Sequence, residues 1–191
     1  GAGVEATFKG KIIGKDLTPW PSHSDWSAEF AKAKAAKPDG VFIFYPGAAT
    51  AKYLTQYRQA GLDKTLPLYH VFSIDGANLP LLQKAGLKNV IGTRQTSFWS
   101  PDLDNAQNKK FVAAYRKRSG GIYPAFYAAQ AYDTMFLIKS AVEGVNGNLK
   151  DIDGMRATMK KADFPSVRGK FRFGKNHFPI QNFYEREVVV D

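Results

Sequence analysis

A short apolar run followed by helical spacing is the most informative pattern in this chain. Residues 41–45 (VFIFY) are β-branched or aromatic, and the run is too short for a helix of ordinary length. Such a run is typical of a strand buried on both faces, as in parallel sheets. Pro46 and Gly47 then break the run. Apolar residues recur at helical spacing over residues 48–60, and Gly61 stands where a left-handed helix terminator is expected. The stretch therefore predicts a strand, a tight turn and a helix.

The same alternation of short strands and helices surrounds this stretch. Ser24 is a candidate N-cap for a helix that places Trp26 and Phe30 on one face. Asp75 is a candidate cap for a short helix that Gly86 ends. Further strands are predicted at residues 11–17, 67–71 and 89–93. This alternation indicates the βαβ units of a parallel sheet, and hence an α/β fold.

The rhythm changes after Arg94. Residues 95–105 predict an irregular connection, and a helix led by Asn105 or Asn108 follows it. Two more helices are predicted at residues 123–143 and 149–162, and strand character returns at residues 167–173 and 183–190. The helix at 123–143 is apolar nearly all round, which predicts burial within a larger body. Few strands remain to cover it, so part of the fold is expected to be missing from this chain.

The composition is that of a folded domain, with 44% hydrophobic and 14% aromatic residues among 191. The absence of cysteine excludes disulfides, thiolate metal sites and cysteine nucleophiles. The net charge of +10 is the one extreme value, but the basic residues are scattered along the chain. Dispersed charge favours a solvated basic surface over a polyanion footprint, so no nucleic-acid partner is expected.

Neither a catalytic nor a cofactor motif emerges. The sequence lacks G-x-S-x-G, H-E-x-x-H and a phosphate-binding glycine loop. His23, His70 and His177 are too dispersed to predict a metal site. We therefore expect a protein that is not an enzyme and has no cofactor or metal.

Several segments, read in order, resemble bacterial substrate-binding proteins of the leucine/isoleucine/valine-binding type. These are the type I periplasmic binding proteins of ABC transporters. The segments that carry the resemblance are KPDGVFIFYPG, AATAKYLTQYRQAGL, LPLYH, NVIGT, NKKFVAAYRKRSGGIYP, AFYAAQAYDTMFLIKSAVEG and SVRGKFRFGKNHFP. Their order and spacing match the C-terminal part of the family over nearly the whole chain.

The resemblance implies two α/β lobes joined by three crossing strands, with ligand in an interlobe cleft that closes by hinge motion. It places residues 1–94 and 175–191 in the second lobe. Residues 95–174 would form hinge crossings and the C-terminal helices of the first lobe. The N-terminal half of the family fold is absent, so the missing N-terminal portion of the same protein is an expected partner.

Physical reasoning and the resemblance indicate the same ligand-binding edge, because ligands of open α/β sheets bind at the carboxyl ends of the strands. The residues implied are Tyr45, Pro46 and Gly47 after one strand, His70, Phe72 and Ser73 at the next, and Tyr127 near the start of the long helix. Alternatives stay open: core packing for Tyr45, a hydrogen-bonded loop position for His70, and a helix cap for Asp75. Arg94 could meet an anionic ligand or form a hinge salt bridge.

The expected ligand follows from a missing charge. Amino-acid binders of this family use an acidic residue for the ligand ammonium, but Phe72 stands near that place and Asp75 comes later in the loop. A buried ammonium without an acceptor is strongly unfavourable. The sequence therefore favours an aromatic acid over a branched-chain amino acid.

The function implied is a periplasmic solute receptor that hands its ligand to ABC permease subunits. The alternative is the effector-binding domain of a LacI-type transcription regulator, which has a related fold but needs a helix-turn-helix headpiece. A signal sequence at the native N-terminus would favour the transporter.

Overall fold

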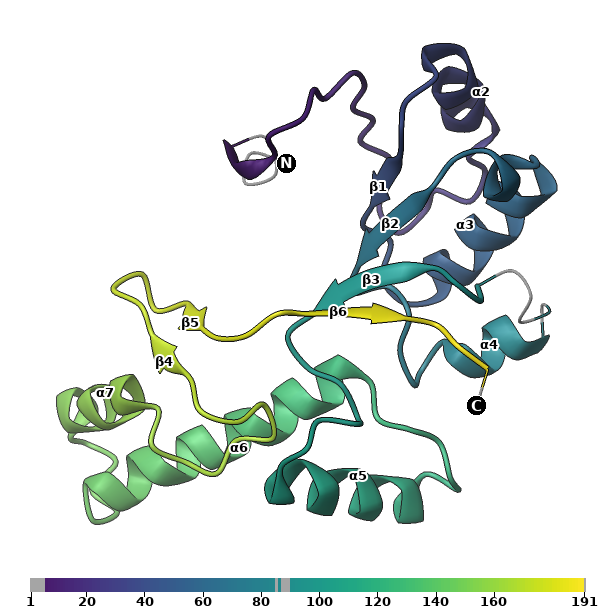
Figure 1. Cartoon of the computed structure of the whole chain (residues 1–191). Coiled ribbons are helices and arrows are strands. Elements are labelled where there is room, and N and C mark those ends of the chain that lie inside the picture. Colours follow the sequence, from purple (N-terminus) through teal and green to yellow (C-terminus); the bar gives the residue numbers. More distant parts are fainter. Residues whose placement is uncertain (1–5, 85, 87–89, 191) are drawn as a thin grey trace. The chain divides into compact units, whose positions relative to one another are not determined.

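The computed structural model describes residues 6–84, 86 and 90–190, and the chain divides into two compact units (Figure 1). Unit 1 comprises residues 1–73, 81–94 and 187–191, and unit 2 comprises residues 74–80 and 95–186. The chain therefore passes between the units after residues 73, 80, 94 and 186.

Helices and short strands alternate through the first half of the chain, as the sequence predicts. In order they are α2 (Ser27–Ala36), β1 (Val41–Ile43), α3 (Ala48–Gln59), the 3-10 helix η1 (Leu62–Lys64), β2 (Leu68–Val71), α4 (Leu79–Lys84) and β3 (Arg94–Ser97). The second half contains α5 (Ala106–Arg118), α6 (Phe126–Gly144), α7 (Ile152–Lys161), β4 (Arg172–Phe173), β5 (Pro179–Ile180) and β6 (Tyr184–Glu187).

The predicted parallel sheet is confirmed, with strand order β1-β2-β3-β6. β1 and β2 pair in parallel, in a register that places Ile43 opposite His70. The prediction that β1 is buried on both faces is wrong. Ile43 is buried, whereas Phe42 and Phe44 are 53% and 54% exposed. Successive strand residues point to opposite faces, so the described chain covers only one face of β1.

An aromatic cluster fills the core of unit 1 and joins α2 and α3 to the covered face of the sheet. Tyr53 on α3 lies edge-on to Trp26 and Phe30, with ring centroids 5.4 and 5.2 Å away. The Tyr57 hydroxyl donates to the Leu66 carbonyl at 2.8 Å, so its polar end is satisfied inside the core. Edge-to-face aromatic pairs of this kind add about 0.5–1.5 kcal/mol each beyond the area they bury.

The N-terminus of α2 is held by Asp25, and the prediction that Ser24 caps it is wrong. The Asp25 carboxylate accepts hydrogen bonds from the Ser27 hydroxyl and the Ser27 amide at 2.6 and 3.0 Å. These two hydrogen bonds, the hydroxyl first, lower the pKa of Asp25. A carboxylate one residue closer to the helix outcompetes a serine hydroxyl, because charged acceptors form the stronger hydrogen bonds.

Two predicted strands do not form where the sequence placed them. Residues 11–17 carry no strand and are largely exposed, because a strand requires a hydrogen-bonded neighbour and none pairs with this segment among the described residues. Of the strand predicted at 89–93, Asn89 lies outside the described residues. Val90 instead begins a turn in which its carbonyl accepts from the Thr93 amide at 3.0 Å. The strand β3 starts at Arg94.

The start of α5 agrees with one of the two predicted positions. The Asn105 side chain accepts a hydrogen bond from the Asn108 amide at 2.8 Å, which makes Asn105 the N-cap. Asn108 itself is fully buried and accepts from the Trp99 indole at 2.8 Å. This side chain therefore fixes the irregular connection that leads into the helix.

The long helix α6 forms as predicted, and the described chain covers only part of its apolar surface. Ala129 and Asp133 are buried, whereas Met135 and Ile138 are 64% and 40% exposed. α7 packs against α6 (Figure 1). The rest of the apolar surface stays open because the described chain supplies too few elements to cover a helix of 19 residues.

The strand character predicted at 167–173 is reduced to β4, which pairs with β5 in an antiparallel hairpin. The strand predicted at 183–190 is confirmed in its first part, as β6.

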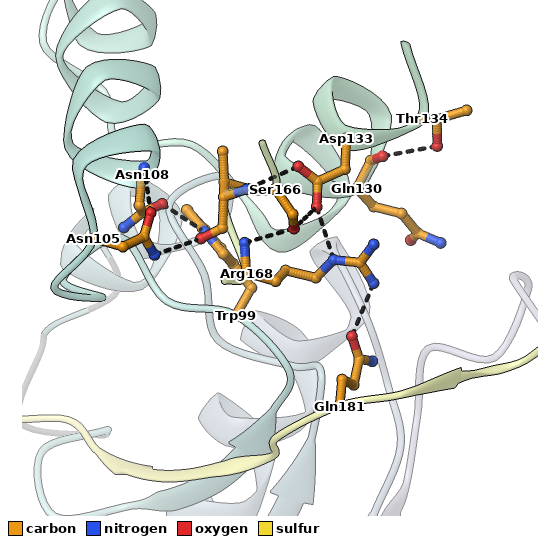
Figure 2. Close-up of polar contacts among 10 residues, drawn as sticks. Trp99, Asn105, Asn108, Gln130, Asp133, Thr134, Ser166, Arg168 and Gln181 are labelled. Carbon is orange, nitrogen blue, oxygen red and sulfur yellow. Dashed lines mark hydrogen bonds and ion pairs between the residues drawn. The ribbon is translucent and has the colours of Figure 1, made fainter. Parts of the chain in front are cut away.

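A buried ion pair ties α6 to the segment before β4 (Figure 2). Asp133, 1% exposed, accepts hydrogen bonds from the Ser166 hydroxyl at 2.6 Å and the Val167 amide at 2.9 Å. Arg168 Nε donates to the same carboxylate at 2.8 Å, and Arg168 Nη1 donates to Gln181 Oε1 at 2.8 Å. Since the carboxylate has several donors and the guanidinium two acceptors, the burial of both charges is compensated.

We expect the Asp133→Ala substitution to lower the free energy of unfolding by about 3 kcal/mol, because Arg168 is then left buried without its partner. Urea denaturation followed by circular dichroism measures the change. Asp153→Ala is the matched control, since the pair of Asp153 with Arg156 is exposed and its loss should matter little. Equal losses in the two variants would contradict the role assigned to Asp133.

Candidate functional site

The structure brings two predicted site loops to one edge of the sheet in unit 1. Tyr45, Pro46 and Gly47 follow β1, and Phe72 and Ser73 follow β2. Because β1 and β2 are parallel neighbours, both loops leave the sheet at the same edge. This is the edge at which open α/β sheets bind ligands.

Thr50 in the first turn of α3 joins the two loops. Its hydroxyl, fully buried, donates to the carbonyl of Tyr45 and to that of Ser73, the latter at 3.0 Å. One proton is shared between an acceptor at the end of β1 and an acceptor at the end of β2. The two loops and the start of α3 are therefore held together as one piece.

Tyr45 packs partly into the aromatic core. Its ring stacks on Tyr53 with centroids 5.1 Å apart and lies edge-on to Trp26 at 5.2 Å. Its hydroxyl is 3.0 Å from the Thr18 hydroxyl. The packing alternative raised by the sequence therefore applies to one part of this side chain.

Two residues of the loops have left-handed backbone conformations. Gly47 (φ 68°) immediately precedes α3, at a position where glycine alone avoids a steric penalty. Phe72 (φ 51°) is in the same region although it has a bulky side chain. Gly47 lets the chain turn sharply enough for the amide end of α3 to follow β1 directly, and this positive end of a helix dipole favours anions.

His70 lies within β2 instead of in the loop, and its side chain points to the buried face. It is 2% exposed and is in register with Ile43, which belongs to the aromatic core. Neither ring nitrogen has a hydrogen-bond partner among the described residues. Burial lowers the pKa of His70 to about 4, so the imidazole is neutral at pH 7.

Tyr127 lies in the first turn of α6, in unit 2, and is 55% exposed. Its ring contacts that of the buried Phe126, with centroids 4.3 Å apart. Phe126 in turn lies edge-on to Phe98 at 6.3 Å. An exposed aromatic ring on a firmly packed helix start is available to bind another molecule.

The two charged candidates are engaged with other protein groups. The Asp75 carboxylate accepts from the amides of Ala77 and Asn78 at 2.9 and 3.2 Å, which is the capping role predicted for it. Burial raises the pKa of Asp75. Arg94 pairs with Glu187 at 3.5 Å, in accordance with the salt-bridge alternative.

Within residues 6–84, 86 and 90–190, no group of three or more histidine, aspartate or glutamate side chains could hold a metal ion. In the same part of the chain, no helix has the length and apolar character needed to cross a membrane.

Sequence reasoning missed two side chains that shape the loops, Thr50 and Gln95. The Gln95 side chain accepts from the Ile74 amide at 3.0 Å and donates to the Ile74 carbonyl. A threonine at a helix start and a glutamine after a turn have no distinctive sequence pattern. Their roles depend on which backbone carbonyls and amides the fold brings next to them.

Comparison with known proteins shows extensive similarity. The sequence profile of the family described as "Periplasmic binding protein" matches residues 1–190. A Leu/Ile/Val-binding protein homolog 6 from Brucella melitensis is 30% identical over 173 residues, which cover 87% of this chain and 43% of that protein.

Solved structures show the same similarity. A solute-binding protein of an ABC transporter from R. palustris, in complex with benzoate, matches with a TM-score of 0.85 and 31% identity. The match covers 97% of this chain and 50% of that one. A second, from Rhodopseudomonas palustris BisB5 in complex with 3,4-dihydroxy benzoic acid, has a TM-score of 0.71 and 30% identity, covering 86% of this chain and 44% of that one. The chain thus spans about half the length of these relatives.

We expect Thr50→Val to lower the free energy of unfolding by about 1–3 kcal/mol, because valine has nearly the same shape but leaves two carbonyls without their donor. Chemical denaturation measures the loss. Thr50→Ser keeps the hydroxyl and should lose clearly less. A Thr50→Ser variant as unstable as Thr50→Val would show that the methyl group, not the hydrogen bonds, matters.

His70 should make folding less stable as the pH falls from about 6.5 to about 4, because the unfolded chain takes up a proton there that the folded chain does not. The free energy of unfolding should fall by roughly 3 kcal/mol, because the pKa of His70 differs by two or more units between the folded and the unfolded chain. Unfolding of the unmodified chain and of His70→Asn, each measured at a series of pH values, isolates the contribution of His70. His177→Asn, at an exposed position, is the control and should keep the full pH dependence. A His70→Asn variant with unchanged pH dependence would contradict the assignment.

Proposed function

We propose, from the premise that this chain belongs to the periplasmic binding protein family, that it forms part of a solute receptor of an ABC importer. The observation that carries the proposal is the pair of loops joined by Thr50 at the carboxyl edge of a parallel sheet. The relatives described as solute-binding or Leu/Ile/Val-binding proteins support this function over the transcription-regulator alternative. The proposal assigns capture and release of a ligand, not catalysis.

The proposed ligand contacts are the residues that the sequence implied. Tyr45, Pro46, Gly47, Phe72 and Ser73 would contribute from the two loops of unit 1, with His70 close behind them in β2, and Tyr127 would contribute from α6. Aromatic rings would contact the apolar body of the ligand. The amide end of α3 would hold a carboxylate.

We favour an aromatic acid as ligand over a branched-chain amino acid. Asp75, the nearest acidic residue to the second loop, already caps the segment before α4 through two backbone amides. An amino-acid ligand would bring an ammonium group that needs a buried acceptor. The benzoate and 3,4-dihydroxy benzoic acid bound by two relatives are consistent with this chemistry.

The remaining assignments concern the whole protein, of which this chain would be about half. We assign residues 1–94 and 175–191 to the second lobe of the family fold, and residues 95–174 to hinge crossings and helices of the first lobe. The proposed partners are the N-terminal portion of the same protein and the permease subunits, and the proposed location is the periplasm. Ligand would stabilise a closed state that the permease recognises, because a ligand shifts a conformational equilibrium only by binding one state better.

Thermal-shift measurements with benzoate, 4-hydroxybenzoate, leucine and isoleucine test the ligand class. A ligand present at about one hundred times its dissociation constant stabilises the folded state by about 2.7 kcal/mol. We expect the aromatic acids to raise the melting temperature and the amino acids to have little effect. The reverse order would contradict the preference for an aromatic acid.

Tyr127→Ala should weaken binding of the active ligand by up to about tenfold, since an aromatic pair contributes about 0.5–1.5 kcal/mol beyond the area it buries. Calorimetric titration measures the affinity. The melting temperature without ligand should change little, because the Tyr127 ring is 55% exposed. Tyr69→Ala is the control, since Tyr69 is 49% exposed and lies outside the proposed site. A large fall in the melting temperature without ligand, with unchanged affinity, would assign Tyr127 to the core.

A further inference from the structure

The backbone of Phe72 has a conformation that is unfavourable for a residue with a bulky side chain. Its φ of 51° lies in the left-handed region, where a residue with a Cβ and a bulky ring is disfavoured. Such a residue persists only where its surroundings determine the backbone more strongly than its own preference does. The contacts on either side of Phe72 should therefore explain the conformation.

On one side the backbone is fixed through Ser73. The Ser73 carbonyl accepts from the buried Thr50 hydroxyl at 3.0 Å, and the Ser73 hydroxyl donates to the Val71 carbonyl at 2.9 Å. The second bond spans Phe72 and closes a local turn around it. The Ser73 carbonyl and the Ile74 amide belong to one planar peptide group, so the Thr50 contact holds one edge of that group.

Gln95 holds the other edge of this peptide group, through the Ile74 amide, and also the peptide after it, through the Ile74 carbonyl. Gln95 Oε1 accepts from the Ile74 amide at 3.0 Å, and Gln95 Nε2 donates to the Ile74 carbonyl. Ile74 and Gln95 are 5% and 6% exposed, so water competes little for these bonds. A side-chain amide carries a donor group and an acceptor group. Here both bond to the backbone of Ile74, as the backbone of a neighbouring strand would.

We propose that Gln95 is a positioning residue for the second ligand-binding loop: by clamping the backbone of Ile74 it keeps Phe72 left-handed, so that Phe72 and Ser73 are presented to the ligand. The effect on ligand binding rests on the proposed function, whereas the hydrogen bonds between Gln95 and Ile74 do not depend on it. Glutamine suits the role because glutamate at neutral pH could only accept, and an apolar residue could do neither.

Hydrogen exchange of the Ile74 amide tests the clamp without any ligand. In Gln95→Ala we expect this amide to exchange about tenfold faster or more, because a buried hydrogen bond is removed. Gln59→Ala, at an exposed position on α3, is the control and should leave Ile74 protected. Unchanged exchange in Gln95→Ala would overturn the proposal.

Two substitutions at residue 72 separate positioning from general loss of stability. Glycine adopts positive φ without a steric penalty. With Gln95 present, Phe72→Gly should therefore be more stable to denaturation than Phe72→Ala, and in the Gln95→Ala background this difference should shrink. An equal difference in the two backgrounds would show that Gln95 does not act through the conformation of residue 72.

Titration with benzoate measures the functional consequence. If the unmodified chain binds benzoate, Gln95→Ala should bind it about tenfold more weakly or worse, and Gln59→Ala should bind it normally. Full affinity in Gln95→Ala, with Ile74 exchanging fast, would overturn the positioning role. If the unmodified chain binds neither benzoate, 4-hydroxybenzoate nor isoleucine, the proposed function fails for this chain. The hydrogen-exchange measurement and the stability comparison at residue 72 then still decide whether Gln95 holds the loop.

Discussion

The Thr50 hydroxyl is the interaction on which the arrangement of the loops depends. Parallel strands that end side by side leave their last carbonyls at one edge of the sheet, with no further strand residue to satisfy them. Thr50 supplies a donor to both carbonyls from the first turn of the helix that follows β1. The helix start, the Tyr45 loop and the Ser73 loop are thereby fixed relative to one another. A ligand at this edge would meet a preorganised surface and would need to order little on binding.

The interiors of unit 1 and unit 2 contain different stabilising interactions, and this affects how each unit tolerates substitutions. Unit 1 has a core of aromatic rings beneath its sheet, in which Trp26, Tyr53 and Tyr57 share many partners. A substitution that removes one methylene there therefore weakens several contacts, each by a small amount. Unit 2 also buries aromatic rings, Trp99 and Phe111 among them, and adds a buried ion pair between Asp133 and Arg168. Removal of one member of that pair leaves an uncompensated charge.

The sequence predicted the order of helices and the parallel sheet well, because these depend on local periodicity. It failed at residues 11–17, where the alternating pattern is that of a strand but no partner strand is present among the described residues. It also failed for β1, since an apolar run cannot show whether both faces are covered. At the site, family resemblance identified loop residues, whereas Thr50 and Gln95 act on backbone groups that only the fold brings near them.

The proposal of an anionic ligand in preference to a zwitterionic one rests on the charges around the loops. The Asp75 carboxylate accepts hydrogen bonds from two backbone amides, and Arg94 pairs with Glu187. Both charged groups therefore already interact with other groups of the protein. His70 is neutral at pH 7 because burial has lowered its pKa to about 4. What the described strand ends offer a ligand is therefore the amide end of α3 and aromatic surface. Amides at a helix start attract a carboxylate and repel an ammonium group. A planar acid satisfies both features of this edge, whereas an amino acid would need a negative partner from elsewhere in the protein.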